Sequence, residues 1–220
     1  MIIDGLPGRS IREMFSVTLV AMMKEGKYAM DNFEDLVLKT RSYRRFDESF
    51  AIERETLEKL MGLARCTASA ANRQPLKYIL SADPETNARI FPCLGWAGYL
   101  KDWAGPGPGE QPTAYIVILV DKRIGENIWC DDGIVAQTIL LAAVEMGLGG
   151  CMIGAIKKDN LREELDVPDH FKIQLVLALG KPAEKVVIED LEPGGDFKYW
   201  RDENDVHHVP KRTLDELIIK

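Results

Sequence analysis

Residues 131–156, DDGIVAQTILLAAVEMGLGGCMIGAI, stand out as the candidate core of the molecule. From Ile134 to Met146, ten of the thirteen residues are apolar, and they fall on every side of a helix with about 3.6 residues per turn. The pattern predicts a core helix that is buried on all sides, in part by a second subunit, and that is too short to span a bilayer. Four glycines that follow it would let the backbone come close to something flat, namely Gly147, Gly149, Gly150 and Gly154.

The composition is that of an ordinary soluble enzyme, with 46% hydrophobic and 29% charged residues among 220. A net charge of −7 without a basic stripe argues against nucleic acid as a partner. The four cysteines form no C-x-x-C pair and the three histidines lack zinc-ligand spacing, so we expect reduced thiols and no metal site. These observations favour a cytoplasmic protein without a membrane partner.

The N-terminal region raises the question of a signal peptide, because residues 17–23 (VTLVAMM) are apolar. That run is short, acidic residues precede it, and no clear small-x-small cleavage site follows. The segment Ser10-Ile-Arg-Glu13 is instead a capping box, with apolar residues at helical spacing behind it. We therefore predict an amphipathic helix over residues 10–25. Residues 1–29 are assigned to a helical extension, and residues 30–220 to one domain.

Apolar runs, punctuated by glycine and proline, predict a mixed α+β domain. Residues 115–121 (YIVILVD) and 173–181 (IQLVLALGK) read as strands buried on both faces, and residues 77–81 as a third strand. We predict a short strand or loop at 151–156 and helices over residues 31–39, 53–65, 87–100 and 160–165. We expect residues 189–209 to run over the surface, and the apolar residues of the C-terminal segment 211–220 to be buried against another element.

Residues 105–112 (GPGPGEQP) are rich in glycine and proline. They cannot form a helix or an inner strand, because proline lacks an N–H donor and glycine loses much entropy when it is ordered. We therefore expect irregular structure, for which a surface turn and a mobile active-site flap are equally good interpretations.

Three guanidinium groups and a hydroxyl lie within five residues, at Arg41, Ser42, Arg44 and Arg45. Guanidinium forks match phosphate oxygens, so the cluster suits a phosphate dianion. Taken alone, the cluster is explained more easily as a solvated basic turn. Lys211 and Arg212 form a second basic pair with the same two interpretations.

Two side-chain amides, Asn72 and Gln74, bracket a loop of small residues. An amide donates and accepts at once, which suits the edge of a flavin or a nucleobase, and Asn-x-Gln-Pro is equally good turn chemistry. The glycines after the central helix do not form a dinucleotide fingerprint, because that motif follows a strand and opens a helix. No P-loop, nucleophile elbow or paired carboxylate stands out, so we name no catalytic side chain.

Taken together, four motifs over residues 31–220 resemble those of the nitroreductase-like FMN enzymes. Arg41-Ser-Tyr-Arg-Arg-Phe46 is similar to their phosphate-binding R-S-x-R-x-F motif, and Ser69-Ala-Ala-Asn-Arg-Gln-Pro75 to their S-A-x-N-x-Q-P loop. The apolar helix with Gly147-Leu-Gly-Gly-Cys-Met-Ile-Gly154 resembles their central helix and glycine-rich turn. Val209-Pro-Lys-Arg212 resembles their C-terminal basic element.

The resemblance implies a nitroreductase-like α+β fold, with a central mostly antiparallel sheet flanked by helices, in an intertwined homodimer that holds FMN at the subunit interface. It assigns the FMN phosphate and ribityl chain to Arg41, Ser42, Arg44, Lys211 and Arg212. It assigns the isoalloxazine ring to Ser69, Ala70, Asn72 and Gln74. It places backbone amides near the flavin N5 at Met152, Ile153 and Gly154.

Three further positions bear on the resemblance. Trp96 looks like part of a substrate-facing wall, and core packing explains a lone tryptophan equally well. Thr40 stands where many members carry another arginine, and Leu76 replaces the aromatic residue common after Q-P. The first departure would weaken phosphate binding slightly, and the second leaves the choice of substrate more open.

The resemblance implies an oxidoreductase that passes hydride from NADH or NADPH, through FMN, to an electron-poor small molecule such as a nitroaromatic, quinone or enone, by a ping-pong mechanism. One alternative is a related enzyme that performs reductive dehalogenation or flavin fragmentation. Another is a flavin-binding storage or sensing protein without NAD(P)H turnover. A third is an interaction protein without a cofactor.

Overall fold

The computed structural model of the chain describes residues 32–219. The extension 1–29 and the helix expected at 10–25 lie outside the described residues. The centre of the molecule is a four-stranded sheet in the order β1-β2-β4-β3, in which all neighbours are antiparallel. Its strands are β1 (Leu76–Ser81), β2 (Ala114–Asp121), β3 (Gly149–Ile153) and β4 (Phe171–Gly180). The predicted mixed fold with a central antiparallel sheet is confirmed.

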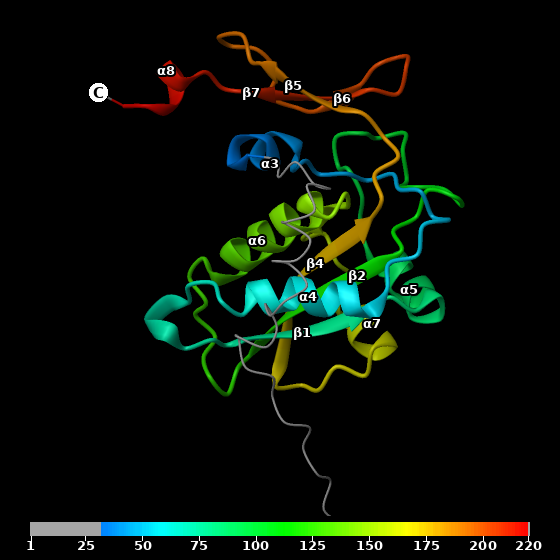
Figure 1. The fold of residues 1–220 in the computed structure, drawn as a ribbon, viewed down its shortest axis with the longest axis vertical. Coiled ribbons are helices and arrows are strands. Elements are labelled where there is room, and N and C mark those ends of the chain that lie inside the picture. The colour runs from blue at the N-terminus through cyan, green and yellow to red at the C-terminus, as the bar shows by residue number, and fades with distance from the viewer. Residues whose placement is uncertain (1–31, 220) are drawn as a thin grey trace, which may run out of the picture.

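Strand β2 divides the hydrophobic core into two layers. All eight of its residues are buried, and successive side chains point to opposite faces of the sheet. Ile116 and Ile118 pack with α4 (Arg54–Ala64) and α6 (Asp131–Glu145) on one face. Val117 and Leu119 pack on the other face, where α5 (Pro84–Ile90), η2 (Phe91–Cys93) and α7 (Lys158–Glu164) lie. Figure 1 shows the sheet between these two helical layers.

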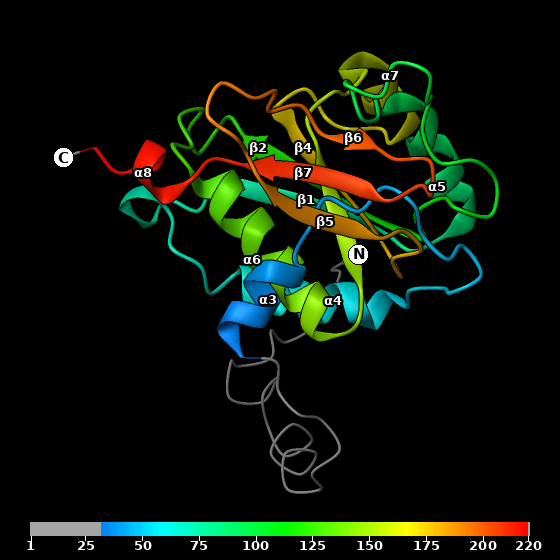
Figure 2. The same cartoon turned by 90° about the horizontal axis from the view of Figure 1, so that it is seen from above.

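Helix α6 is buried on one side only, so the prediction of burial on all sides is wrong for the single chain. Val135, Ile139 and Ala143 face the core, with at most 4% of their surface exposed. Ile134 on the outer side is 36% exposed, and Leu141 is half-buried. Helix α3 (Phe33–Lys39) lies against part of α6 (Figures 1 and 2). Apolar side chains of α3, among them Phe33 and Leu38, are exposed to solvent.

The helix expected at residues 87–100 is a shorter helix at a different position. Helix α5 begins earlier, because the carboxylate of Asp83 caps it by accepting a hydrogen bond from the N–H of Thr86 at 2.8 Å. It ends at Ile90, and Pro92, which has no N–H to donate, lies in the short turn η2 that follows.

The expectation that residues 189–209 run over the surface is confirmed, since all of them except Leu191 and His207 are exposed or half-buried. They contribute to a second, three-stranded sheet in the order β5-β7-β6. Its strands are β5 (Val186–Asp190), β6 (Trp200–Arg201) and β7 (His207–Lys211), and β5 pairs with β7 in parallel. This small sheet lies across the end of the molecule beyond α3 (Figure 1).

The C-terminal apolar side chains are exposed in the single chain, contrary to expectation. Helix α8 (Leu214–Leu217) projects from the end of β7, as Figures 1 and 2 both show. Leu214 is 71% exposed and Ile219 is 95% exposed. An apolar surface of this kind requires a partner surface to bury it.

Candidate functional site

The glycines after α6 allow residues 41–44 to lie against β3. Ser42 forms a β-bridge with Gly150, and the N–H of Tyr43 donates to the carbonyl of Gly150 at 3.0 Å. A Cβ added at Gly150 would lie 2.6 Å from the carbonyl oxygen of Ala178, and one at Gly149 would lie 2.5 Å from the ring of Tyr43. The space beside Gly149 and Gly150 is therefore occupied by other residues of the protein, and not by a flat ligand. At Gly154, which is exposed, a Cβ would meet nothing within 4 Å.

The two basic groups singled out in the sequence meet in one cavity of about 280 Å³. We call it the basic cavity, and it is lined by Thr40, Arg41, Ser42, Arg44, Tyr199, His207, Val209 and Lys211. Three of these side chains are cations and none is a carboxylate. Alternate residues of β7 line it, because residues two apart on a strand point to the same face. The long-range convergence of Arg41 with Lys211 is thus present within one chain.

Arg44 is the buried cation of this cavity, with 9% of its surface exposed. Its Nη1 donates to the carbonyl of Ser42 at 3.1 Å and lies 3.2 Å from Nε2 of His207. Its guanidinium carbon lies 4.8 Å from the centroid of the Tyr199 ring. Within residues 32–219 no carboxylate contacts this guanidinium. A buried charge without a counter-charge is costly, so the surroundings of Arg44 favour an anionic ligand.

The carboxylate of Glu184, which contacts the backbone of the same segment, is compensated by other groups. It accepts hydrogen bonds from the backbone N–H groups of Arg44 and Arg45. Its second oxygen pairs with Nη2 of Arg201 at 2.9 Å. Glu184 therefore positions the backbone of the 41–45 segment and leaves the guanidinium of Arg44 without a counter-charge.

The other predicted cations differ in what holds them. Arg41 donates from Nη2 to the carbonyl of Val37 at 2.8 Å, while its Nε is buried without a partner. Burial lowers the pKa of Arg41. Lys211 is exposed at the end of β7 and forms no ion pair within residues 32–219. Arg212 pairs with Glu216 at 3.1 Å and does not line the cavity.

The loop of residues 69–74, which we call the amide loop, is held at the start of α6. The hydroxyl of Ser69 donates to Asp131 Oδ2 at 2.6 Å, and the N–H of Ala70 donates to Oδ1 at 2.9 Å. The N–H of Gln74 in turn donates to the hydroxyl of Ser69 at 3.0 Å. Asn72 and Gln74 are both exposed, and their amides contact each other: Nε2 of Gln74 donates to Oδ1 of Asn72 at 3.1 Å and to its carbonyl at 3.2 Å.

The backbone of the amide loop is strained. Three non-glycine residues within four positions, Ala71, Asn72 and Gln74, have φ values of 51°, 52° and 51°. Side chains rarely adopt this left-handed region, and clusters of such residues are found at ligand sites. The role of this loop in binding a flavin ring stays a prediction, with which the strained conformation is compatible.

The amide loop and the basic cavity lie at different ends of α6. Asp131 holds the loop and is the first of the 15 residues of the helix. Gly150 forms the bridge with Ser42 and lies in β3, beyond the last residue of the helix, Glu145. At 1.5 Å per residue the helix is about 22 Å long. In Figure 1 the connection between α4 and β1 lies at one end of α6, and the chain leaving α3 lies at the other. One chain does not bring the two predicted halves of the flavin site together.

Trp96 packs against the second core layer. Its ring lies 5.8 Å from that of Phe91, and a Cβ at Gly105 would come within 2.7 Å of it. Its indole N–H is buried without a partner. This geometry supports the packing interpretation, and a role for Trp96 in substrate binding stays a prediction.

The 105–112 loop is tied to the segment that follows the arginine cluster. The carboxylate of Glu48 accepts from the N–H groups of Gly109 and Gln111. Glu110 pairs with Arg45 at 3.2 Å, and its carbonyl accepts from the N–H of Phe46 at 3.0 Å. These contacts favour the surface-turn interpretation over the mobile flap.

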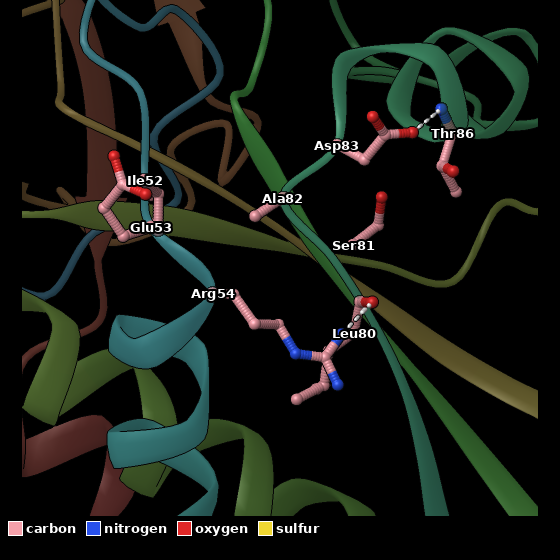
Figure 3. A pocket seen from close by; sticks show the side chains of 8 residues that line it. All are labelled: Ile52, Glu53, Arg54, Leu80, Ser81, Ala82, Asp83 and Thr86. Atoms are coloured by element: carbon pink, nitrogen blue, oxygen red, sulfur yellow. Dashed lines mark hydrogen bonds between the residues drawn. The ribbon is translucent and has the colours of Figure 1, made fainter.

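A second cavity, of about 300 Å³, lies between α4 and the end of β1 (Figure 3). Two of its three charged side chains, Arg54 and Asp83, are already engaged, and the third is the carboxylate of Glu53. Arg54 donates to the carbonyl of Leu80 at 2.8 Å and pairs with Glu58, and Asp83 caps α5. Because these side chains are satisfied by the protein, the basic cavity is the better candidate for a ligand.

Among residues 32–219, no cluster of three or more histidine, cysteine or acidic side chains is arranged to hold a metal ion. In the same part of the chain, no helix has both the length and the apolar character needed to cross a bilayer. All four cysteines are free thiols.

Three residues of the site were not singled out by their sequence. Tyr199 and His207 line the basic cavity, and Asp131 holds the amide loop. In the sequence, His207 belongs only to a set of histidines without zinc-ligand spacing, and Asp131 is only the first residue of the apolar stretch 131–156. Their neighbours in space lie more than 60 positions away in the chain, so local patterns carried no signal for these contacts.

Comparison with known proteins agrees with this geometry. The model of the nitroreductase family matches residues 37–98 and 99–181. The FMN reductase (NADPH) of Bacillus subtilis is 27% identical over 70% of this chain and 67% of its own length. An FMN-dependent nitroreductase of Clostridium difficile R20291 is 26% identical, with a TM-score of 0.56 over 68% of this chain and 87% of that chain. A nitroreductase family protein of Clostridium difficile 630 is 25% identical, with a TM-score of 0.57 over 70% and 86%. The family model covers most of the chain, including the arginine cluster, the amide loop and the glycine turn: the chain belongs to the nitroreductase family.

Proposed function

We propose that the protein is an FMN-dependent oxidoreductase that passes hydride from NADH or NADPH to an electron-poor acceptor. The observation that carries the proposal is the buried guanidinium of Arg44, which faces a cavity with two further cations and no carboxylate. A phosphate monoester supplies the missing negative charge and accepts from several guanidinium N–H groups at once. The names of relatives, an FMN reductase (NADPH) and an FMN-dependent nitroreductase, support the same cofactor.

The residues of the basic cavity fit the tail of FMN. Arg41, Arg44 and Lys211 supply charge, and the hydroxyl of Ser42 supplies a neutral donor. The buried Nε of Arg41 lacks a partner that a phosphate oxygen would provide. Gly154, exposed at the end of β3, leaves room for a planar ring beside the backbone.

When bound, FMN supplies the hydride chemistry, and the protein supplies binding and orientation. The chain's own residues then have three tasks: to hold the phosphate in the basic cavity, to present backbone amides of Met152, Ile153 and Gly154 to the ring, and to present the amides of Asn72 and Gln74 to its pyrimidine edge. No side chain is assigned a proton-transfer step, so we propose that solvent supplies protons. Donor and acceptor would occupy the same face of the ring in turn, which gives ping-pong kinetics.

We propose that a second copy of the chain completes each site as a homodimer. The amide loop is separated from the basic cavity of its own chain by the length of α6, so the loop of one protomer would serve the cavity of its partner. The outer face of α6, with Ile134 and Leu141, and the exposed apolar residues of α3 and α8 offer the surface that such a dimer would bury. The free thiols are compatible with the reducing cytoplasm, which is the compartment that we propose.

The test begins with the absorption spectrum of the purified protein before and after anaerobic addition of NADH or NADPH. We expect a yellow protein that binds FMN and is bleached by at least one of the two. Arg41→Ala and Lys211→Ala should each weaken FMN binding roughly tenfold, because each removes a charge-assisted contact to phosphate. Arg54→Ala is the matched control, since Arg54 is an arginine outside the basic cavity.

The alternatives give different results in this experiment. A flavin storage or sensing protein would be yellow and would resist bleaching by both nucleotides. A colourless protein without affinity for FMN would overturn the proposal, and the arginine cluster would then be a solvated turn. A reductive dehalogenase or a flavin-fragmenting enzyme would be separated by product analysis with nitroaromatic, quinone, enone and halogenated acceptors.

A further inference from the structure

The basic cavity contains two buried nitrogen atoms without a hydrogen-bond partner, Nε of Arg41 and Nδ1 of His207. His207 is 1% exposed, and it lies outside the residues matched by the family model. A buried donor or acceptor left unpaired loses its hydration without compensation. An unpaired polar atom beside a cavity therefore indicates that a bound ligand supplies its hydrogen-bond partner.

The tautomer of His207 follows from its neighbour. Nη1 of Arg44 lies 3.2 Å from Nε2 of His207, and a guanidinium can only donate. Nε2 must therefore accept, which places the single proton of the neutral ring on Nδ1. Burial, with the charge of Arg44 as the second cause, lowers the pKa of His207 to about 4, so the ring is neutral at physiological pH.

The ring is held in place independently of any ligand. Its backbone N–H donates to the carbonyl of Lys185 at 2.8 Å, and β7 pairs His207 with Val186 and with Arg201. The ring of Tyr199 lies 5.2 Å away and covers both His207 and Arg44. The unpaired Nδ1–H is thus a fixed donor beside the cations of the cavity.

We propose that His207 is a further phosphate-binding residue, which orients Arg44 through Nε2 and donates from Nδ1–H to the phosphate of FMN. This inference rests on the proposed function, because it assumes that the basic cavity receives that phosphate. A neutral donor at this position adds a hydrogen bond without adding a fourth positive charge. It would contribute to the preference for FMN over riboflavin, which has no phosphate.

The test measures the affinities of FMN and riboflavin for the wild type and two variants. The amide of Gln in His207→Gln can still accept from Arg44 near the position of Nε2, but it places no donor near Nδ1. The shorter amide in His207→Asn places a donor near Nδ1 and loses the acceptor for Arg44. We expect His207→Gln to bind FMN roughly tenfold more weakly and to bind riboflavin as the wild type does. His207→Asn should bind FMN more tightly than His207→Gln and more weakly than the wild type, because it keeps a donor near Nδ1 and loses the acceptor for Arg44.

Two outcomes overturn the role of His207. If His207→Gln retains the full FMN affinity, the Nδ1–H does not reach the phosphate. If FMN and riboflavin affinities fall together, the residue is structural only. If the Gln variant fails to fold, ¹⁵N NMR of the His207 imidazole in the wild type tests the same point. Binding of FMN, but not of riboflavin, should shift the Nδ1 signal. A signal that FMN leaves unchanged contradicts the proposal.

The same measurements separate this inference from the proposed function. If the wild type binds riboflavin as tightly as FMN, the phosphate assignment of the whole cavity fails. If Arg41→Ala loses the preference for FMN while His207→Gln keeps it, the cavity assignment stands and only the role of His207 is wrong.

Discussion

The carboxylate of Asp131 and the hydroxyl of Ser69 form a buried contact of 2.6 Å between the start of α6 and the amide loop. Asp131 is 2% exposed, and its other oxygen accepts from the N–H of Ala70 at 2.9 Å. Burial, and then the negative charge of Asp131, raise the pKa of Tyr78 to about 12. The first residue of the central helix thus fixes the conformation of a strained loop that lies 60 positions earlier in the chain.

Asp131→Asn should loosen the amide loop. The amide offers the Ala70 N–H a neutral oxygen, and its nitrogen can only donate to the Ser69 hydroxyl, so two charge-assisted contacts are replaced by weaker neutral ones, at a cost of about 1–3 kcal/mol. We expect a lower urea midpoint, faster hydrogen exchange of the Ala70 and Gln74 amides, and weaker FMN binding. Asp132→Asn removes the same charge from the same turn and leaves both contacts intact. Equal exchange rates in the two variants would contradict the assignment.

Gly150→Ala should disturb the basic cavity, because Gly150 forms a β-bridge with Ser42, which lines that cavity. The added methyl group would lie 2.6 Å from the carbonyl oxygen of Ala178 and 2.8 Å from Leu140, so the strand or the 41–44 segment must shift. Overpacking of this kind costs about 1–3 kcal/mol. The measurement is the free energy of unfolding, together with FMN affinity. Gly107→Ala is the control, because nothing lies within 4 Å of its added Cβ. An unchanged free energy of unfolding in the Gly150 variant would contradict the prediction, because it would show that β3 can shift to accommodate the methyl group without loss of stability.

The stability of the small C-terminal sheet should depend on pH through His208. Its Nδ1 contacts Glu189, its Nε2 lies 3.4 Å from Asp202, and its ring stacks on that of Trp200 at 4.1 Å. Burial acts to lower the pKa of His208, but the two carboxylates outweigh it and the pKa is raised. The native state therefore holds this proton more tightly than the unfolded state.

This contribution is fully present below the unfolded pKa of about 6.5 and is lost as the pH rises through the raised folded pKa. The stability difference between wild type and His208→Gln should therefore decrease as the pH rises above about 6.5 and become constant once the raised folded pKa has been passed, as measured by urea unfolding. Taking the difference removes the separate contribution of His207, whose lowered pKa acts on the acid side of pH 6.5. A difference that is constant with pH would contradict the role of the two carboxylates.

The outer face of α6 should be the interface between two copies. Placing a charge there, as in Leu141→Glu, should give a monomer by sedimentation and should abolish FMN binding, because burying an unpaired carboxylate is unfavourable. Asn160→Asp adds the same charge at an exposed position of α7, which packs on the other face of the central sheet, and it shows whether charge alone or its place on the outer face of α6 matters. A Leu141→Glu variant that remains dimeric with full FMN affinity would move the interface elsewhere.

The two inner strands of the central sheet, β2 and β4, could be predicted because their sequences are nearly continuous apolar runs. β2 is buried along its whole length and β4 from Val176 to Gly180, so their patterns need no knowledge of their partners. The small sheet could not be predicted, because β5, β6 and β7 have two to five residues each and mix polar with apolar side chains. The burial of α6 was overestimated because the sequence does not separate surface covered within the chain from surface left for a partner.

The cations of the site could be predicted for a similar reason. Arginines and a lysine within motifs of known chemistry remain recognisable without coordinates, and Arg41 and Lys211 do line one cavity. His207 and Asp131 act through single atoms whose partners are brought together by strand register and helix packing. Their roles depend on which nitrogen accepts and which oxygen is buried, and residue type alone does not carry that information.

The placement of the basic cavity and the amide loop at the two ends of α6 has a genetic consequence. A chain carrying Arg41→Ala would keep a sound amide loop, and a chain carrying Asn72→Ala would keep a sound cavity. If both are produced in one cell, mixed dimers would pair the two intact halves at one of their two sites. Neither variant alone should turn over NAD(P)H efficiently, while the mixture should show intragenic complementation.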